Sequence, residues 1–129
     1  MKTIKTSSSR GQSLVEWAFV LPIILLVTMM ILDLGRAVYY YSAIYNSARE
    51  GARYAVIYPD DTAGISTRVK NMSVGLSDAD LTVSTTLPTE KTVRVSVTYR
   101  FVAVTPLVSA LLGSSDITLR SQTTMQVEK

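Results

Sequence analysis

The chain contains 129 residues, 47% of them hydrophobic, and it has neither cysteine nor histidine. The absence of both residue types excludes disulfide bonds, thiol or imidazole catalysis and the usual zinc sites. The formal net charge is +3, yet Lys2, Lys5 and Arg10 account for all of it, because the other 10 basic side chains are matched by 10 acidic ones. A basic nucleic-acid-binding surface is therefore not expected.

Residues 1–11 form a basic leader that is rich in serine and threonine and shows no hydrophobic periodicity. A segment of this composition is expected to be disordered. Positive charge just before an apolar segment favours the cytoplasmic side of a membrane. The leader therefore predicts a cytoplasmic N-terminus.

Residues 12–34 carry the apolar stretch and are predicted to form a transmembrane helix. No charged residue occurs from Trp17 to Leu32. At about 1.5 Å per residue this run spans roughly 24 Å, and its flanks bring the length close to the ~30 Å hydrocarbon core. Pro22 falls inside, where a membrane helix tolerates proline as a kink. A secretory signal peptide is the alternative, but no small-residue cleavage site follows the apolar core.

The helical pattern continues beyond the membrane, since no proline follows Pro22 until Pro59. Gly51 weakens a helix by roughly 1 kcal/mol but permits close approach of a packing partner. We expect one helix from about residue 13 to about residue 58, with its C-terminal half packed on a domain. Apolar residues at three- and four-residue spacings predict its packed face: Ala37, Tyr41, Ile44, Tyr45, Ala48, Ala52 and Ala55.

Residues 35–129 are predicted to form an extracytoplasmic domain that begins with this helix extension. Alternating apolar and polar residues indicate an antiparallel sheet with one buried face, and such a small sheet needs a helix to cover it. The fold class is therefore α+β, with a small three-stranded antiparallel sheet on the distal half of a long N-terminal helix. The expected elements are a helix at 63–75 capped by Asp61 or Thr62, strands within 81–87, 91–104 and 116–129, a hairpin turn at 88–91, and a short helix or loop at 105–115.

Glu16 is unusual because it lies only two or three positions inside the apolar run. A carboxylate near the membrane centre costs about 2.5–3.5 kcal/mol, and less near the edge. One interpretation places Glu16 in the headgroup zone with no further role. The other gives it a function in assembly.

The segment from Arg10 to Trp17 resembles a prepilin peptidase site. A short basic leader ends in Gly11, and Glu16 and an aromatic residue follow after four more positions, at the start of an apolar helix. The resemblance implies cleavage between Gly11 and Gln12 on the cytoplasmic side. It also implies that Glu16 then neutralises the new Gln12 amine of a neighbouring subunit, which would select axial register.

Over residues 11–56 the chain resembles TadE-like proteins, which are pseudopilins or minor pilins of the tight-adherence (Tad, Flp-type) pilus system. The matching features are Val15-Glu16-aromatic, Leu21-Pro22, Asp33-x-Gly35-Arg36, and Ala48, Arg49, Glu50, Gly51, Ala52 and Arg53, with a similar Thr105-Pro106-Leu107 connection. Trp17 departs from the commoner Phe or Tyr. The chain is longer than expected of the major Flp pilin, which favours a minor subunit.

The resemblance implies a pilin-like fold and a single-pass protein of the bacterial cytoplasmic (inner) membrane, with its C-terminal domain extracytoplasmic or incorporated into a pilus. The implied partners are inner-membrane lipid, a prepilin peptidase, other pilins or pseudopilins and the pilus assembly platform, in the service of cell adhesion. Nucleic acid, a small-molecule substrate, a cofactor and a metal are not expected. A permanently anchored, uncleaved extracytoplasmic binding module is the alternative function.

Other residues have simpler explanations. Asp33 and Arg36, three positions apart at the predicted membrane exit, are expected to form a helix-surface ion pair. Arg49, Glu50 and Arg53 are expected to be solvated or paired within the helix. Four tyrosines suit an interfacial aromatic belt followed by core packing: Tyr39, Tyr40, Tyr41 and Tyr45. We find no catalytic residues, because a Ser-His-Asp triad needs histidine and no other nucleophile motif occurs.

Overall fold

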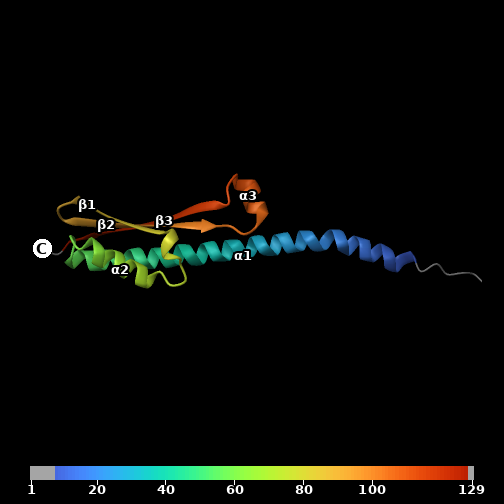
Figure 1. Ribbon diagram of the computed structural model, residues 1–129, viewed down its shortest axis with the longest axis horizontal. Helices are drawn as coiled ribbons and strands as arrows, with labels where there is room; N and C mark the ends of the chain where they lie inside the picture. The colour runs from blue at the N-terminus through green and yellow to red at the C-terminus, as the bar shows by residue number, and fades with distance from the viewer. Residues whose placement is uncertain (1–7, 128–129) are drawn as a thin grey trace, which may run out of the picture.

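The computed structural model describes residues 8–127, so Lys2 and Lys5, on which the predicted topology depends, lie outside the described residues. Helix α1 (Ser8–Ile57) is 50 residues long and continues through Pro22. At about 1.5 Å per residue it measures roughly 75 Å. Its N-terminal half projects alone, whereas all other elements gather on its C-terminal half (Figure 1). The helix begins earlier than predicted, so the expectation of disorder was wrong for residues 8–11.

The remaining elements are short and follow the predicted order. They are α2 (Thr62–Met72), the 3-10 turn η1 (Asp78–Asp80), β1 (Leu81–Thr89), β2 (Thr92–Val102), α3 (Pro106–Leu112) and β3 (Asp116–Gln126). Asp61 caps α2, since its carboxylate accepts a hydrogen bond from the Gly64 N–H at 2.9 Å. Gly113 ends α3 in the left-handed conformation with φ 70°, which a residue without a Cβ adopts easily.

The three strands form an antiparallel meander in the order β1-β2-β3. The predicted α+β architecture is therefore confirmed. The hairpin is tighter than expected, because Thr89 pairs with Thr92 after a register shift that begins at Thr86. Pro88 lies within that irregular stretch, where its missing N–H interrupts no regular ladder.

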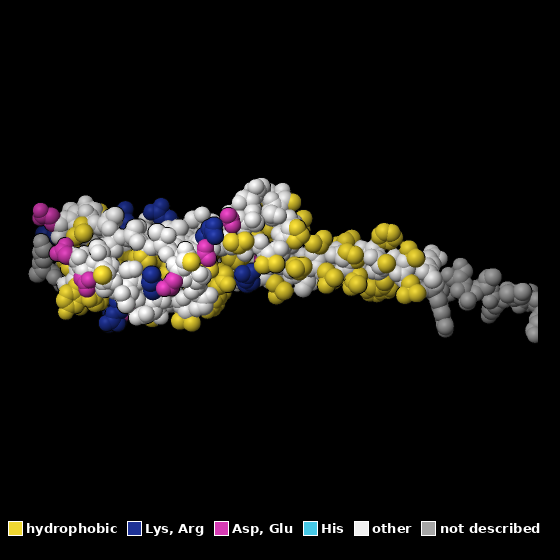
Figure 2. All heavy atoms as spheres, in the orientation of Figure 1, with side chains coloured by type: hydrophobic (Ala, Val, Ile, Leu, Met, Phe, Trp, Pro, Cys, Tyr) yellow, Lys and Arg dark blue, Asp and Glu magenta, His cyan; other side chains and the backbone are white. Residues whose placement is uncertain are grey.

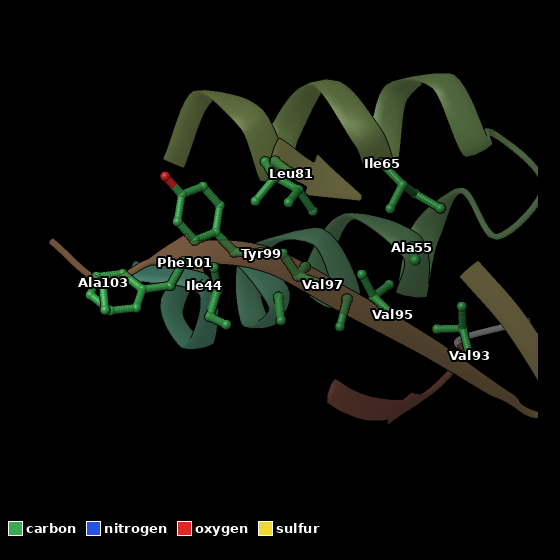
Figure 3. Close-up of a cluster of buried hydrophobic side chains, with 13 residues drawn as sticks. Ile44, Ala55, Ile65, Leu81, Val93, Val95, Val97, Tyr99, Phe101 and Ala103 are labelled. Atoms are coloured by element: carbon green, nitrogen blue, oxygen red, sulfur yellow. The ribbon is translucent and has the colours of Figure 1, made fainter. Parts of the chain in front are cut away.

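The core lies between the sheet, α1 and α2 (Figure 3). Strand β2 contributes every second residue, as the alternation predicted, and all of these are buried: Val93, Val95, Val97, Tyr99 and Phe101. From α2, Ile65 and Val69 complete this layer and are fully buried. Leu87, at the end of the segment predicted as the first strand, is exposed because it lies within the register shift.

The packed face of α1 differs from the predicted face by one position at the tyrosines. Ile44, Ala48, Ala52 and Ala55 are fully buried as predicted. Tyr41 and Tyr45 are exposed, so their predicted place in the core was wrong. Tyr40 occupies that place instead, with its ring centroid 5.3 Å from that of Tyr99 and 5.8 Å from that of Phe101.

Candidate functional site

The residues of the predicted cleavage and assembly site lie on the exposed N-terminal part of α1. Gly11 and Gln12 are already helical, nearly two turns before Trp17. A side chain added at Gly11 would meet nothing within 4 Å. Glu16 is exposed and shares a shallow hollow of about 230 Å³ with Trp17 and Val20. The spacing of these residues places the carboxylate and the apolar side chains on one helix face.

An apolar band follows this segment along the free half of α1. Residues 11–29 are all exposed, and hydrophobic side chains cover much of the free helix on the face seen in Figure 2. The helix is long and apolar enough to cross a bilayer, which fits a single-pass anchor near the N-terminus. The one exposed hydroxyl group in the middle of the band, that of Thr28, donates to the Ile24 carbonyl at 2.8 Å and so needs no solvent partner.

Asp33 marks the boundary between the free half and the packed half of α1, and it is only 5% exposed. Its Oδ2 atom accepts hydrogen bonds from the backbone N–H groups of Val104 (3.0 Å) and Thr105 (2.7 Å). Its Oδ1 atom lies 3.1 Å from the Nη1 atom of Arg36. The predicted ion pair with Arg36 is confirmed, but its placement on the helix surface was wrong for Asp33. The carboxylate ties α1 to the segment that enters α3.

Arg36 completes this contact from one turn further along α1. Its guanidinium carbon lies 5.4 Å from the Phe101 ring centroid and 5.8 Å from that of Tyr40, within cation–π range. The Tyr40 hydroxyl and the Asp33 carboxylate raise the pKa of Arg36 above its ordinary value. The charge is therefore held against the end of β2. Gly35, between the two charged residues, has nothing within 4 Å of an added Cβ.

The segment Ala48–Arg53 divides into a packing face and a solvent face. Ala48 and Ala52 are fully buried, and a Cβ added at Gly51 would lie 2.5 Å from the Cγ2 atom of Val69. The small residues therefore let α2 pack directly on the α1 backbone. The charged residues face away, and the Nη1 atom of Arg53 lies 4.0 Å from Glu50 Oε2. Arg49 lies 5.9 Å from the Tyr45 ring centroid.

A second capping contact closes the far end of the domain. The Asp61 carboxylate accepts a hydrogen bond from the Tyr54 hydroxyl (2.8 Å) in addition to its bond from Gly64. These two donors, Gly64 first, hold the pKa of Asp61 below its ordinary value. The same contact raises the pKa of Tyr54. Among residues 8–127 no cluster of acidic side chains is suited to hold a metal ion.

The backbone donors of Val104 and Thr105 to Asp33 were not predicted from the sequence. The sequence offered one signal for them, namely the position of Asp33 at the end of the uncharged run that begins at Trp17. A carboxylate that becomes buried there requires hydrogen-bond donors. Its partners are 71 and 72 residues away in the chain, so only the fold identifies them.

This arrangement defines a class of protein: a pilin-like fold in which the exposed apolar half of one long helix extends from a small α+β domain. Residues 11–53 match the family model described as TadE-like protein, which confirms the resemblance over this segment. The match is confined to α1 and does not reach the sheet. No curated protein and no solved structure matches the chain.

Proposed function

We propose that this protein is a pseudopilin or minor pilin of a Tad (Flp-type) pilus and that a prepilin peptidase cleaves it between Gly11 and Gln12. In this proposal residues 1–11 are the leader, 12–34 span the cytoplasmic membrane, and 35–129 form the extracytoplasmic domain. The single observation that carries the proposal is the family match, which begins at residue 11, where the leader would end. The protein then takes part in pilus assembly for adhesion, with other pilins and the assembly platform as partners.

The geometry around the bond supports cleavage from the membrane surface. Gly11 and Gln12 lie in the second turn of α1, near an end where helices fray. Glycine weakens that turn by roughly 1 kcal/mol relative to alanine. No other element covers it, because all elements after α1 lie between the middle of the helix and its C-terminal end (Figure 1). A peptidase can therefore unwind the first turns without disturbing the domain.

Glu16 has a role in this proposal that a lone subunit cannot explain. A carboxylate in lipid costs up to about 2.5–3.5 kcal/mol, and Glu16 is exposed on the half of α1 that projects from the domain. Cleavage would create a cationic amine at Gln12. Pairing of Glu16 with that amine in a neighbouring subunit would remove the cost and would favour one axial register. Trp17 and Val20, on the same face, would pack in the same interface.

The test is the intact mass of the protein extracted from membranes of cells that carry the matching peptidase. We expect loss of residues 1–11 and a new N-terminus at Gln12. The matched control is the same strain without the peptidase, in which the precursor mass should remain. A precursor mass in the presence of active peptidase would refute the pilin assignment and would favour a permanently anchored binding module.

The role of Glu16 is tested separately in the cleaved protein. Glu16→Gln should leave cleavage intact and reduce incorporation into pili. Glu50→Gln makes the same chemical change on the solvent face of the domain, where Glu50 makes only a 4.0 Å pair with Arg53, and should leave both unchanged. If Glu16→Gln were incorporated into pili as well as the wild type is, Glu16 would have no role in assembly.

A further inference from the structure

Helix α3 lies beside the boundary of the apolar band rather than within the sheet (Figure 1). Between α3 and α1 is a cleft of about 330 Å³. From the last turn of the apolar band it is lined by Met30, Ile31 and Leu34, and from α3 by Val108 and Leu112. Asp33 is the one charged residue in its lining, and its carboxylate is already bonded to the backbone before α3.

Helix α3 has an apolar face that the rest of the described chain covers only in part, since Val108 packs against the core while the leucines at the C-terminal end of the helix are exposed. Val108, Leu111 and Leu112 share this face by their three- and four-residue spacings. Leu111 is 72% exposed and Leu112 is 63% exposed, and Val104, just before the helix, is 63% exposed. The segment between Arg100 and Asp116 contains no charged residue. Apart from the apolar run in α1, it is the longest uncharged run in the chain.

The depth of α3 along α1 is fixed by the Asp33 contact. Asp33 ends the apolar band, and its carboxylate bonds Val104 and Thr105, immediately before Pro106 begins α3. Since the band is the part of α1 suited to lipid, α3 lies at the level where α1 leaves the hydrocarbon. In Figure 2 the hydrophobic side chains at this end of the domain adjoin those of the free helix.

We propose that α3 is a second membrane contact, which rests in the headgroup–acyl boundary of the bilayer that α1 spans. Amphipathic segments at this boundary bury their apolar face about 5–10 Å deep. The exposed leucines would enter the outer leaflet, and an acyl chain would fill the cleft. The occupant is lipid because the surface is uncharged and continuous with the membrane-spanning band. This inference rests on the membrane anchoring in the proposed function.

The α3 contact would orient the domain on the membrane. With α1 alone as anchor, the domain is free to tilt relative to the bilayer. Contact of α3 with lipid on one side of α1 fixes both the tilt of the domain and the direction that the domain faces. The precursor or cleaved subunit is then held in one orientation in the membrane before assembly.

The absence of cysteine from the chain permits a clean test with single-cysteine variants of the full-length protein. Leu111→Cys reports on α3, Leu25→Cys on the membrane-spanning band, and Thr86→Cys on the solvent face of β1; all three side chains are exposed. Each variant carries an environment-sensitive fluorophore and is reconstituted in phosphatidylcholine–phosphatidylglycerol vesicles. Quenching is measured with nitroxide-labelled lipid and with aqueous iodide.

We expect the fluorophore at position 111 to show blue-shifted emission, quenching by nitroxide lipid and protection from iodide, as at position 25. The fluorophore at position 86 should show the opposite behaviour. Iodide quenching at 111 with lipid quenching at 25 would overturn the inference and leave the anchor intact. Protection at 111 from both quenchers would also overturn it and would indicate cover by a second copy. Absence of lipid quenching at 25 would refute the membrane anchor itself, and the inference with it.

Discussion

Replacement of Gly51 by alanine is expected to destabilise the domain, although alanine is the better helix former. Gly51 lies on the face of α1 that packs against α2 and β2. An added Cβ would lie 2.5 Å from the Cγ2 atom of Val69 and 3.3 Å from the Cγ1 atom of Val95. Both valines are fully buried, and a β-branched side chain has few alternative rotamers. The clash can be relieved only by moving α2 away from α1.

The magnitude follows from two opposing effects. Alanine gains about 1 kcal/mol of helix propensity over glycine. Insertion of a methyl group into a well-packed core costs about 1–3 kcal/mol. With two rigid neighbours the cost lies toward the upper end, so we expect a net loss of about 1–2 kcal/mol. For a small domain such as residues 35–129 this corresponds to a Tm lower by roughly 4–16 °C.

The matched control is Gly35→Ala in the same helix. An alanine Cβ there meets nothing within 4 Å, so only the gain in helix propensity remains. The assay is thermal unfolding in mild detergent, followed by the near-ultraviolet circular dichroism of the tyrosines. Gly51→Ala should unfold at a lower temperature than the wild type, and Gly35→Ala should not.

A higher Tm for Gly51→Ala than for the wild type, as expected for Gly35→Ala, would refute this prediction. The close approach of α2 would then not constrain residue 51. The glycine of the Ala48–Arg53 segment would need another explanation, such as packing against a neighbouring subunit.

Three further predictions concern the charged residues. Asp33→Ala leaves two backbone N–H groups without an acceptor and should lower the free energy of unfolding by about 2–6 kcal/mol in the same assay. Asp33→Asn retains an acceptor and should lower it by less. Equal stability of both variants and the wild type would contradict this prediction. The folded-state pKa of Asp61 is lowered, so the stability that its carboxylate contributes is present above its unfolded pKa of about 3.9 and is lost as the pH falls through the folded value. Asp61→Asn, which keeps a cap acceptor, should therefore flatten the pH dependence of the Tm below about pH 4. An acid profile identical to that of the wild type would contradict this prediction. Arg100→Ala breaks an exposed pair with Asp80 (3.2 Å) and should change stability by less than about 1 kcal/mol, so a larger loss would show that the outer sheet face contributes more than its exposure indicates.

Local patterns predicted much of this fold. The alternating valines of β2 indicated which face is buried, and Asp61 was one of the two residues predicted to cap α2, whose donor lies only three positions further along the chain. The long helix was predicted by uninterrupted helical periodicity from the apolar band to Pro59. These features depend on residues close in sequence, which is why the sequence alone is sufficient for them.

The tyrosines show where such patterns become ambiguous. From Ala37 to Ile44, a helix stripe can pass through Tyr40 or through Tyr41, because steps of three then four and of four then three both fit the helical repeat. The position of β2 decides between them, since Tyr99 and Phe101 receive the Tyr40 ring. Burial of Asp33 was missed for a similar reason, since its partners come from the distant segment before α3.

The matched segment, residues 11–53, contains two kinds of feature that the structure separates. In its C-terminal part, the burial of Asp33, Ala48 and Gly51 is explained by contacts within this chain. In its N-terminal part, Gly11 and Glu16 are exposed and make no such contribution to the domain. Stability of the folded chain therefore accounts for the first group alone. Contacts within the chain do not explain the second group, and cleavage followed by subunit pairing is the proposal that gives both Gly11 and Glu16 a role.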